Sequence, residues 1–382
     1  MRPAPGLEEP PPGFFARLAL AWRVLMDAML AQRLLLPATT STLPTAPAHE
    51  PIEKVEEKVE EKVEERSIVE ISQSKSEKSI VSMRELVRRG TDQLEKAFNT
   101  KGAITGIATG FMQLDYMTKG FQPGELIVVA ARPSMGKTAF ALNLAAHVSM
   151  RLHKPIMFFS LEMGADQLLH RLLGAEARVG LSDLRRGIIK NEDWSMLAEA
   201  TGRLSEASLY IDETPSISIT DLCDTCRRQK HETGLSMVIV DCLQLMQGPP
   251  GWKNKAAEVG EISRGLKSLA RELGVPVIAL SQVNRSVERR TDKRPMMYDL
   301  RASPSLEQDA DIIAFLYREE YYLGDETPED RIGIAEFILA KHRHGPVGSI
   351  ELRFLSTINR FENLDRYGAV RRAGLRVVKD SD

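Results

Sequence analysis

The chain has 382 residues, 43% of them hydrophobic, which is enough to bury one large core and to leave residues for extensions. Its 51 Lys and Arg residues almost balance its 53 Asp and Glu residues, so the net charge is only −2. This balance excludes a globally basic nucleic-acid-binding protein, and any DNA or RNA site must therefore be a local patch or loop.

The first 82 residues differ in composition from the rest and predict a low-complexity, largely disordered extension. Residues 14–36 are apolar, but four charged residues interrupt them: Arg17, Arg23, Asp27 and Arg33. Burying these charges in a membrane would be costly, and the segment lacks the basic start and unbroken apolar core of a signal peptide. We therefore expect no membrane span, and interpret residues 14–36 as an interaction helix or as unstructured chain.

The sequence EKVE occurs three times in residues 53–64, which places a valine at every fourth position. Such a stripe winds around a helix, so a solvated, partly helical spacer is favoured over a coiled coil. Residues 83–98 then predict an amphipathic helix, within a linker that we place at 83–101.

The sequence ARPSMGKT, residues 131–138, follows an apolar run and opens an amphipathic one. Strand, glycine-containing loop and helix, in this order, are typical of a phosphate-binding loop, whose backbone N–H groups and helix N-terminus bind an anion. Lys137 would reach the β- and γ-phosphates of ATP, and the Thr138 hydroxyl would bind Mg²⁺. Ala131 replaces the usual first glycine, so the alternative is a lysine in an ordinary helix turn. The predicted nucleotide-binding residues are Arg132, Pro133, Ser134, Met135, Gly136, Lys137, Thr138 and Ala139.

Short apolar strands alternate with helical stretches from residue 107 onward. The strand candidates are 126–131, 156–161, 237–241, 277–281, 312–317, 334–340 and 349–355. The first five are almost wholly apolar, which predicts an α/β fold whose mainly parallel sheet is covered on both faces. The last strands follow through short turns and predict an antiparallel extension of the sheet, before a tail at 362–382.

Polar residues follow four of these strands, at the edge where an open α/β sheet binds its ligands. Beyond the phosphate loop they are Glu162, Asp241, Ser281 and Gln282. One carboxylate for Mg²⁺ and one for the attacking water are the minimum for nucleotide hydrolysis. A single acid in such a place is more often a helix cap or a turn residue. The four strand ends together predict a hydrolytic site.

Cys223 and Cys226 form a lone C-x-x-C pattern within residues 220–233. A zinc site needs more ligands than this pair supplies, and no second pair or well-spaced histidines accompany it. We interpret both as ordinary residues of a helix. Three cysteines in total exclude a disulfide framework and favour a reduced, cytoplasmic protein.

Residues 102–361 resemble the motor domain of the DnaB-type replicative DNA helicases, hexameric relatives of RecA. Several long motifs occur in the same order, among them GELIVVAARPSMGKTAFALNLA, FFSLEM, VIVDCLQLM, VPVIALSQVNR and AKHRHGPVG. The alanine that opens the phosphate loop is also usual in this family. The resemblance implies a RecA-like P-loop NTPase that hydrolyses ATP, moves 5′ to 3′ on single-stranded DNA as a hexamer, and unwinds duplex during replication.

The resemblance also implies roles for individual residues. Lys137 and Thr138 would hold phosphate and Mg²⁺, Glu162 would activate water, Asp241 would bind Mg²⁺, and Gln282 would sense the γ-phosphate. The family's AKxRxGPxG motif supplies a Lys and an Arg to the ATP of the neighbouring subunit, here Lys341 and Arg343. Taken alone, that stretch would be interpreted as a basic turn on the solvated surface.

Two loops of the family grip the DNA backbone, and they correspond to residues 247–257 and 298–306. The implied DNA-binding residues are Lys255, Arg301 and Ser303, and phosphate contacts of this kind are sequence-independent and salt-sensitive. The second loop departs from the family's usual RESG, because it reads RASP and Pro304 lacks a backbone N–H.

Residues 1–82 do not resemble the family's helical N-terminal domain, so primase docking cannot be assumed. The changed second loop and this difference favour a rival interpretation, a RecA-fold ATP-dependent switch or assembly protein without productive unwinding. The intact catalytic set favours the motor, since a pure binding module does not need it. The same set argues against a decayed helicase copy.

Overall fold

The computed structural model describes residues 82–88, 90–91, 104–248, 255–300 and 304–364. The described residues from 104 onward belong to one compact unit, and residues 82–88 and 90–91 belong to a second. In the second unit residues 83–88 are helical, and the Arg88 guanidinium donates to the Glu85 carboxylate at 2.9–3.0 Å. The predicted extension, including 14–36 and the EKVE repeat, lies outside the described residues.

In the described part of the chain, six parallel strands form the larger part of a nine-stranded sheet. The order is β3 (Leu209–Asp212), β2 (Ile156–Ser160), β4 (Met237–Asp241), β5 (Val277–Gln282), β1 (Leu126–Ala131) and β6 (Ile312–Tyr317). Every residue of β1, β2, β4 and β6 is buried, as expected for strands covered on both faces. The predicted parallel α/β sheet is confirmed.

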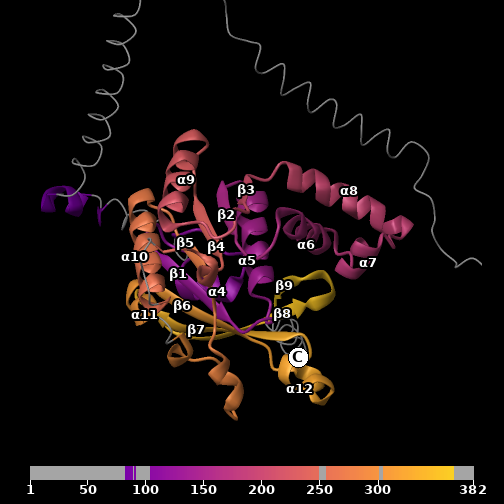
Figure 1. The fold of residues 1–382 in the computed structure, drawn as a ribbon. Helices are drawn as coiled ribbons and strands as arrows, with labels where there is room; N and C mark the ends of the chain where they lie inside the picture. The colour runs from indigo at the N-terminus through magenta and orange to yellow at the C-terminus, as the bar shows by residue number, and fades with distance from the viewer. Residues whose placement is uncertain (1–81, 89, 92–103, 249–254, 301–303, 365–382) are drawn as a thin grey trace, which may run out of the picture. The chain divides into compact units, whose positions relative to one another are not determined.

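The sheet continues from β6 through three antiparallel strands, β7 (Ile334–His342), β8 (Gly348–Leu355) and β9 (Arg360–Asn363). The predicted antiparallel extension is therefore confirmed (Figure 1). The sequence did not predict β3 or β9. Both are four residues long and only partly buried, so their sequences, LYID and RFEN, carry little apolar signal.

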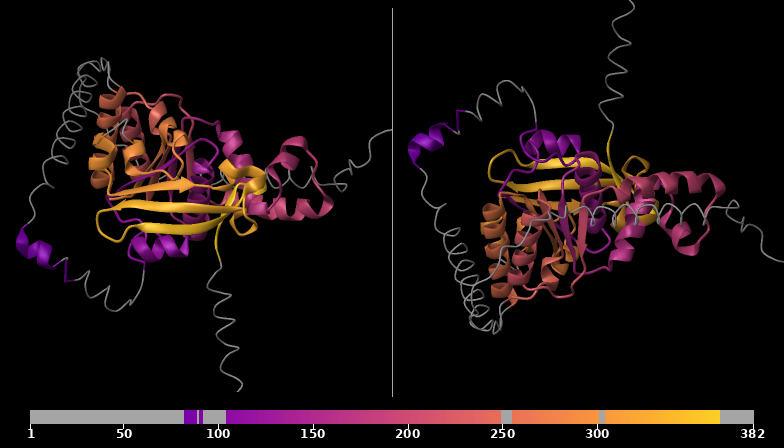
Figure 2. Two further views of the ribbon diagram at one scale, coloured as in Figure 1. Left: turned by 90° about the horizontal axis from the view of Figure 1, so that it is seen from below. Right: turned by 90° about the horizontal axis from the view of Figure 1, so that it is seen from above.

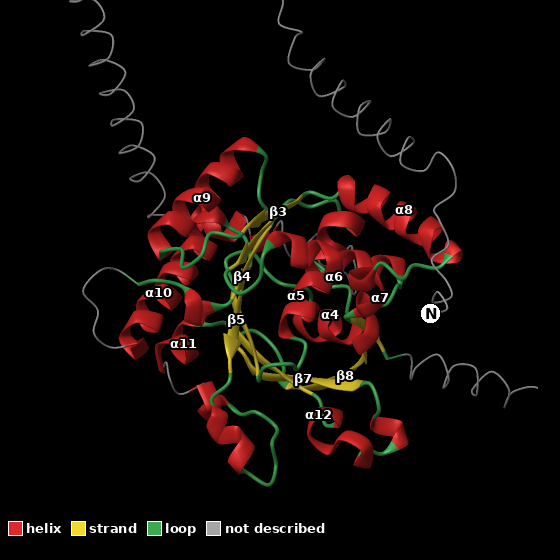
Figure 3. Ribbon diagram, turned by 45° about the vertical axis from the view of Figure 1, so that its right-hand side comes forward, coloured by secondary structure: helices red, strands yellow, loops and turns green. Residues whose placement is uncertain are grey.

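Helices cover both faces of the sheet (Figure 3). One face carries α4 (Met112–Thr118), α5 (Lys137–Ala146) and α6 (Ala165–Ala177), and the other carries α9 (Ile219–Glu232), α10 (Lys255–Leu273) and α11 (Pro304–Asp309). The side chains of β1 alternate between the two resulting cores, because successive side chains of a strand point to opposite faces. Beside α6, α7 (Leu181–Arg186) and α8 (Asn191–Ser205) complete a lobe that projects to one side in both views of Figure 2.

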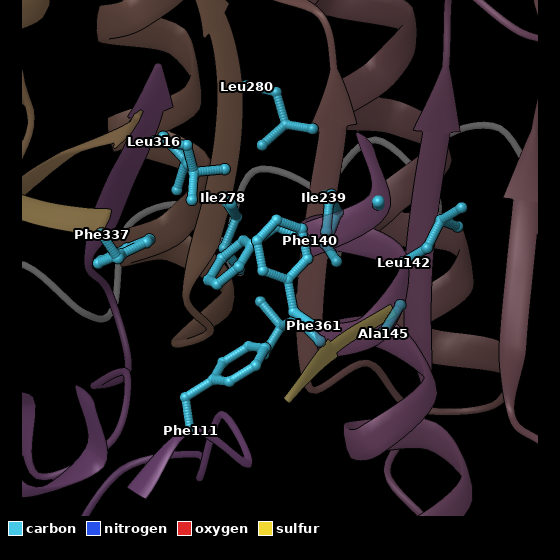
Figure 4. Close-up of a cluster of buried hydrophobic side chains, with 14 of the residues drawn as sticks. Phe111, Phe140, Leu142, Ala145, Ile239, Ile278, Leu280, Leu316, Phe337 and Phe361 are labelled. Atoms are coloured by element: carbon cyan, nitrogen blue, oxygen red, sulfur yellow. The ribbon is translucent and has the colours of Figure 1, made fainter. Parts of the chain in front are cut away.

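Aromatic packing fixes α5 against the sheet. The Phe140 ring stacks on Phe111 and Phe337, with both centroid distances 4.9 Å, and meets the edge of Phe361 at 5.8 Å (Figure 4). Each buried aromatic side chain contributes roughly 2–3 kcal/mol by burial, so this cluster holds the N-terminus of α5, and with it Lys137, in a defined place.

Cys223 and Cys226 are buried on α9, which confirms the helix predicted there. Burial raises the pKa of the Cys223 thiol to about 11 and raises that of Cys226 further. Neither thiol belongs to a metal-binding cluster among the described residues. None of the described helices combines the length and apolar composition that crossing a bilayer requires.

Candidate nucleotide-binding site

The loop between β1 and α5 has the backbone conformation of an anion cradle. Ser134 and Gly136 have positive φ angles of 67° and 95°. A Cβ atom at Gly136 would lie 2.9 Å from the ring of Phe361, so both the φ angle and the packing require glycine. The first turn of α5 has no side-chain cap and no acidic residue. Its free N–H groups are therefore available to an anion.

Four charged or hydroxyl side chains meet beside this loop. The Lys137 Nζ lies 3.1 Å from Oδ1 of Asp241 and 4.0 Å from Oε2 of Glu162. The Thr138 hydroxyl donates to Oδ2 of Asp241 at 2.5 Å. The structure thus brings together the lysine, threonine and two carboxylates that the sequence placed at separate strand ends.

The Thr138–Asp241 pair fits a divalent cation. The Asp241 side chain is only 1% exposed, yet its Oδ1 forms an ion pair with Lys137 and no hydrogen bond. A carboxylate and a hydroxyl are hard oxygen donors of the kind that Mg²⁺ prefers. The Cys242 thiol lies within 4.8 Å of the ligand atoms of Glu162 and Asp241, but burial raises its pKa, and a neutral thiol is a poor ligand for this ion.

Gln282 lies beside the start of the loop, because it pairs in register with Ala131. Its side chain is exposed at the end of β5. The neighbouring Ser281 is buried and accepts a hydrogen bond from the Gln244 amide at 2.8 Å. Of the two polar residues at this strand end, Gln282 is therefore the one that faces outward.

The other loop residues divide into groups with different surroundings. Met135 and Ala139 are buried in the core, whereas Pro133 and Ser134 are exposed. The Ser134 carbonyl accepts from the Arg318 guanidinium at 3.2 Å. The Arg132 side chain pairs with Glu288 at 2.7 Å. Any contact of these residues with phosphate would therefore come mainly from the backbone.

Lys341 and Arg343 lie at the opposite edge of the sheet. His342, between them, pairs with Ile312, the first residue of β6, whereas the phosphate loop follows Ala131, which pairs with Leu316. At about 3.3 Å per residue, the two levels are roughly 13 Å apart along the strands. Neither residue belongs to the charged group around Lys137 in the same chain.

At that edge both cations bind groups of their own chain. The Lys341 ammonium donates to the carbonyls of Glu307 and Ala310 at 2.5 and 2.7 Å, and burial lowers its pKa, with Arg343 adding to the decrease. Arg343 donates to Asp311 at 3.1 Å and to the Gln308 carbonyl. The two side chains therefore cap the C-terminal end of α11, an arrangement that a basic residue commonly adopts.

Comparison with known proteins identifies the family. Residues 106–363 match the model of the DnaB-like helicase C terminal domain. The chain belongs to the DnaB-like helicase family. The "Replicative DNA helicase DnaB" of Geobacillus stearothermophilus is 52% identical over 302 residues, a match that covers 79% of this chain and 66% of that relative. The chain thus spans slightly less than two thirds of the relative's length.

Solved structures agree with the RecA-like fold. A solved ATPase domain with 40% identity is covered over its whole length, with 75% of this chain aligned and a TM-score of 0.71. A second structure, described as a DnaB-like replicative helicase and its interactions with primase, is 38% identical with a TM-score of 0.71, over 81% of this chain and 75% of that one. This DnaB-like chain therefore aligns with the full length of a solved ATPase domain.

The residues predicted to bind DNA are largely outside the described part of the chain. This holds for Arg301, Ser303 and the side chain of Lys255. The stems of the two loops are described, and they adjoin each other, since a Cβ atom on Gly260 of α10 would lie 2.7 Å from the Ser305 hydroxyl of α11. The helices that follow the two predicted DNA loops, α10 and α11, therefore lie next to each other.

Sequence reasoning missed Arg171 on α6. Its Nε atom is buried without a hydrogen bond, and burial and Arg185 lower its pKa while Asp241 and Glu162 oppose the decrease. The residue is thus a further cation near the site's carboxylates. Its sequence context, HRLLGAE, carries no pattern that distinguishes it from any helical arginine.

Proposed function

We propose that this chain is the ATP-hydrolysing motor of a DNA helicase that assembles as a hexameric ring, moves 5′ to 3′ on single-stranded DNA and unwinds duplex during replication. The observation that carries the proposal is the meeting of Lys137, Thr138, Glu162 and Asp241 beside an anion-binding loop, in a DnaB-like chain. A pure binding module would not need this complete set. Family membership also disfavours the rival switch or assembly protein.

In the proposed reaction, ATP phosphates replace Asp241 as the partner of Lys137. Bound Mg²⁺ would neutralise charge on the phosphates, held by the Thr138 hydroxyl and the Asp241 carboxylate. Glu162, with its side chain 48% exposed, can orient a water molecule and accept its proton. Gln282, exposed beside the loop, would contact the γ-phosphate and report its presence.

Lys341 and Arg343 would complete the site of a neighbouring subunit. Their place at the opposite edge of the sheet excludes them from the phosphate site of their own chain. A cation delivered from a neighbour stabilises the charge that develops on the transferred phosphoryl group, and it makes hydrolysis depend on subunit contact. In such a contact Arg343 would exchange its Asp311 and Gln308 partners for phosphate oxygens.

Lys255, Arg301 and Ser303 would hold DNA by contacts to its phosphate backbone, without reading the bases. The cytoplasmic location stays a prediction, and primase docking is not assumed.

Steady-state ATP hydrolysis with and without single-stranded DNA, on a sample whose mass is measured in solution, tests the proposal. Stimulation of a ring-sized species by DNA is the expected result. A monomer or dimer whose hydrolysis ignores DNA would support the switch protein instead.

A further inference from the structure

Arg132 makes contacts that nucleotide binding does not explain. Its side chain is only 10% exposed, and its Nε and Nη2 atoms donate to Glu288 at 2.9 and 2.7 Å. Its Nη1 atom donates to the Val283 carbonyl at 2.9 Å. The arginine of the phosphate loop therefore directs its guanidinium to the segment that follows β5.

That segment is attached to the phosphate loop at a second point. The Val283 N–H donates to the Ala131 carbonyl at 3.1 Å, so residue 283 is held through its N–H by one loop residue and through its carbonyl by the next. Gln282, the proposed γ-phosphate sensor, immediately precedes this clamped residue. Its position thus depends on the attachment.

The C-terminal end of this segment is hydrogen-bonded to its N-terminal end. The Asn284 N–H donates to the Asp299 carbonyl at 3.2 Å, and the buried Asp299 side chain pairs with Arg290 at 3.0 Å. Val287 and Leu300 of this segment are both buried in the same hydrophobic core. Residues 283–300 consequently form a closed unit that includes the first residues, 298–300, of the second predicted DNA loop.

We propose that Arg132 and Glu288 are positioning residues that couple the phosphate loop to DNA binding, by fixing the unit 283–300 to the loop. A shift of the loop on nucleotide binding would move this unit as a body, together with Gln282 at one end and the chain beyond Leu300 at the other. By thermodynamic linkage, DNA binding would act back on the nucleotide to the same extent. The inference rests on the function proposed above.

The test uses Glu288→Ala in the full chain, since Glu288 lies outside the hydrolytic group. Single-stranded DNA affinity is measured with a non-hydrolysable ATP analogue and with ADP, and the ratio of the two affinities reports the coupling. We expect the ratio to fall at least about threefold, while DNA-free hydrolysis and nucleotide affinity stay within about twofold of the parent chain. Glu288→Asp should restore part of the ratio. A Glu288→Ala protein with the parent ratio would overturn the inference.

Two further variants separate coupling from a general loss of ion pairs. Glu272→Ala removes the partner of Arg227 in an α9–α10 pair of 2.7 Å, and it should leave the ratio unchanged. Arg132→Ala combined with Glu288→Ala should lose no more than Arg132→Ala alone, because the two residues act as one unit. Additive losses, or an equal loss in Glu272→Ala, would contradict the coupling. A parent chain that neither hydrolyses ATP nor binds DNA would instead refute the proposed function itself.

Discussion

A charged cluster lies at each end of the parallel strands, and the two clusters differ in character. We call the side of the sheet where these strands end the carboxyl edge, and the side where they begin the amino edge. At the carboxyl edge, Lys137, Glu162 and Asp241 lie close together beside the uncapped first turn of α5, and a buried carboxylate oxygen lacks a hydrogen bond. At the amino edge, Lys341 and Arg343 are each hydrogen-bonded within their own chain. The first cluster is arranged for a ligand, whereas the second is complete in a single chain.

This difference explains why both clusters are needed. Burying the charges of Lys137 and Asp241 is costly, so the carboxyl edge gains from binding phosphate and a cation. The amino edge can contribute cations to another subunit only by giving up its contacts with α11 and Asp311. In the proposed ring, hydrolysis that requires this exchange would be silent in an isolated chain and active where two subunits meet.

The largest expected effect comes from Lys137→Ala, which removes the cation of the carboxyl edge. We expect ATP turnover to be abolished, because a preorganised positive charge at the phosphates is lost. Turnover is measured at saturating ATP, with thermal unfolding as the control for folding. Substantial turnover in a folded variant would refute the site.

Arg343→Ala tests the amino edge. Hydrolysis should fall by about 10³-fold, the usual contribution of an arginine delivered in trans, while nucleotide affinity changes by less than about threefold. Arg353→Ala, at an exposed position on β8, is the matched control and should behave as the parent chain. Parallel loss of binding and hydrolysis would place Arg343 in the site of its own chain.

The sequence predicted the carboxyl edge better than the amino edge. Buried strands such as β1 and β4 are continuous apolar runs, and the residues that follow them converge by the topology of a parallel sheet. Asp311 had no comparable signal, because its partners Lys267 and Arg343 lie 44 and 32 residues away in the chain. For Lys341 and Arg343, only the family resemblance predicted a role in ATP hydrolysis.

The side chain of Arg132 shows a second limit of sequence reasoning. Its place in the loop predicted nucleotide contact, but the structure directs it to Glu288, 156 residues away. Loop chemistry fixes the backbone of a phosphate loop, and tertiary packing decides where a long side chain points.

Asp311→Asn should destabilise the amino edge. The Asp311 carboxylate accepts from the Leu126 N–H at 2.8 Å and from Lys267 at 2.6 Å. Burial would raise its pKa, but these bonds, with Arg343, hold that pKa below its ordinary value of 3.8. Breaking such a buried pair costs about 2–3 kcal/mol of the free energy of unfolding.

The pH dependence of that variant has a defined sign. A lowered pKa in the folded state means that the stabilisation is complete above pH 3.8 and is lost as the pH falls through the folded value. The difference between parent and variant, from urea unfolding, should therefore be largest near neutrality and shrink below about pH 4. A difference that is constant with pH would show that the Asp311 charge contributes nothing.

The smallest effect is expected from Ala302→Glu combined with Pro304→Gly, which restores the family's usual second loop. Since Pro304 lacks a backbone N–H, its replacement can add one phosphate contact, and DNA-stimulated hydrolysis should rise by roughly twofold to fivefold. The control is hydrolysis without DNA, which should not change. No increase with DNA would mean that this loop does not limit the motor.

Mixing two inactive variants tests whether each ATP site combines Lys137 of one subunit with Arg343 of its neighbour. Lys137→Ala keeps Arg343, and Arg343→Ala keeps the phosphate site, so in a mixed ring some contacts pair an intact Lys137 with an intact Arg343. Mixing the two proteins should therefore restore ATP hydrolysis above the sum of the separate samples. Mixed rings, verified by mass, that stay inactive at every ratio would contradict the claim that each site is completed by its neighbour.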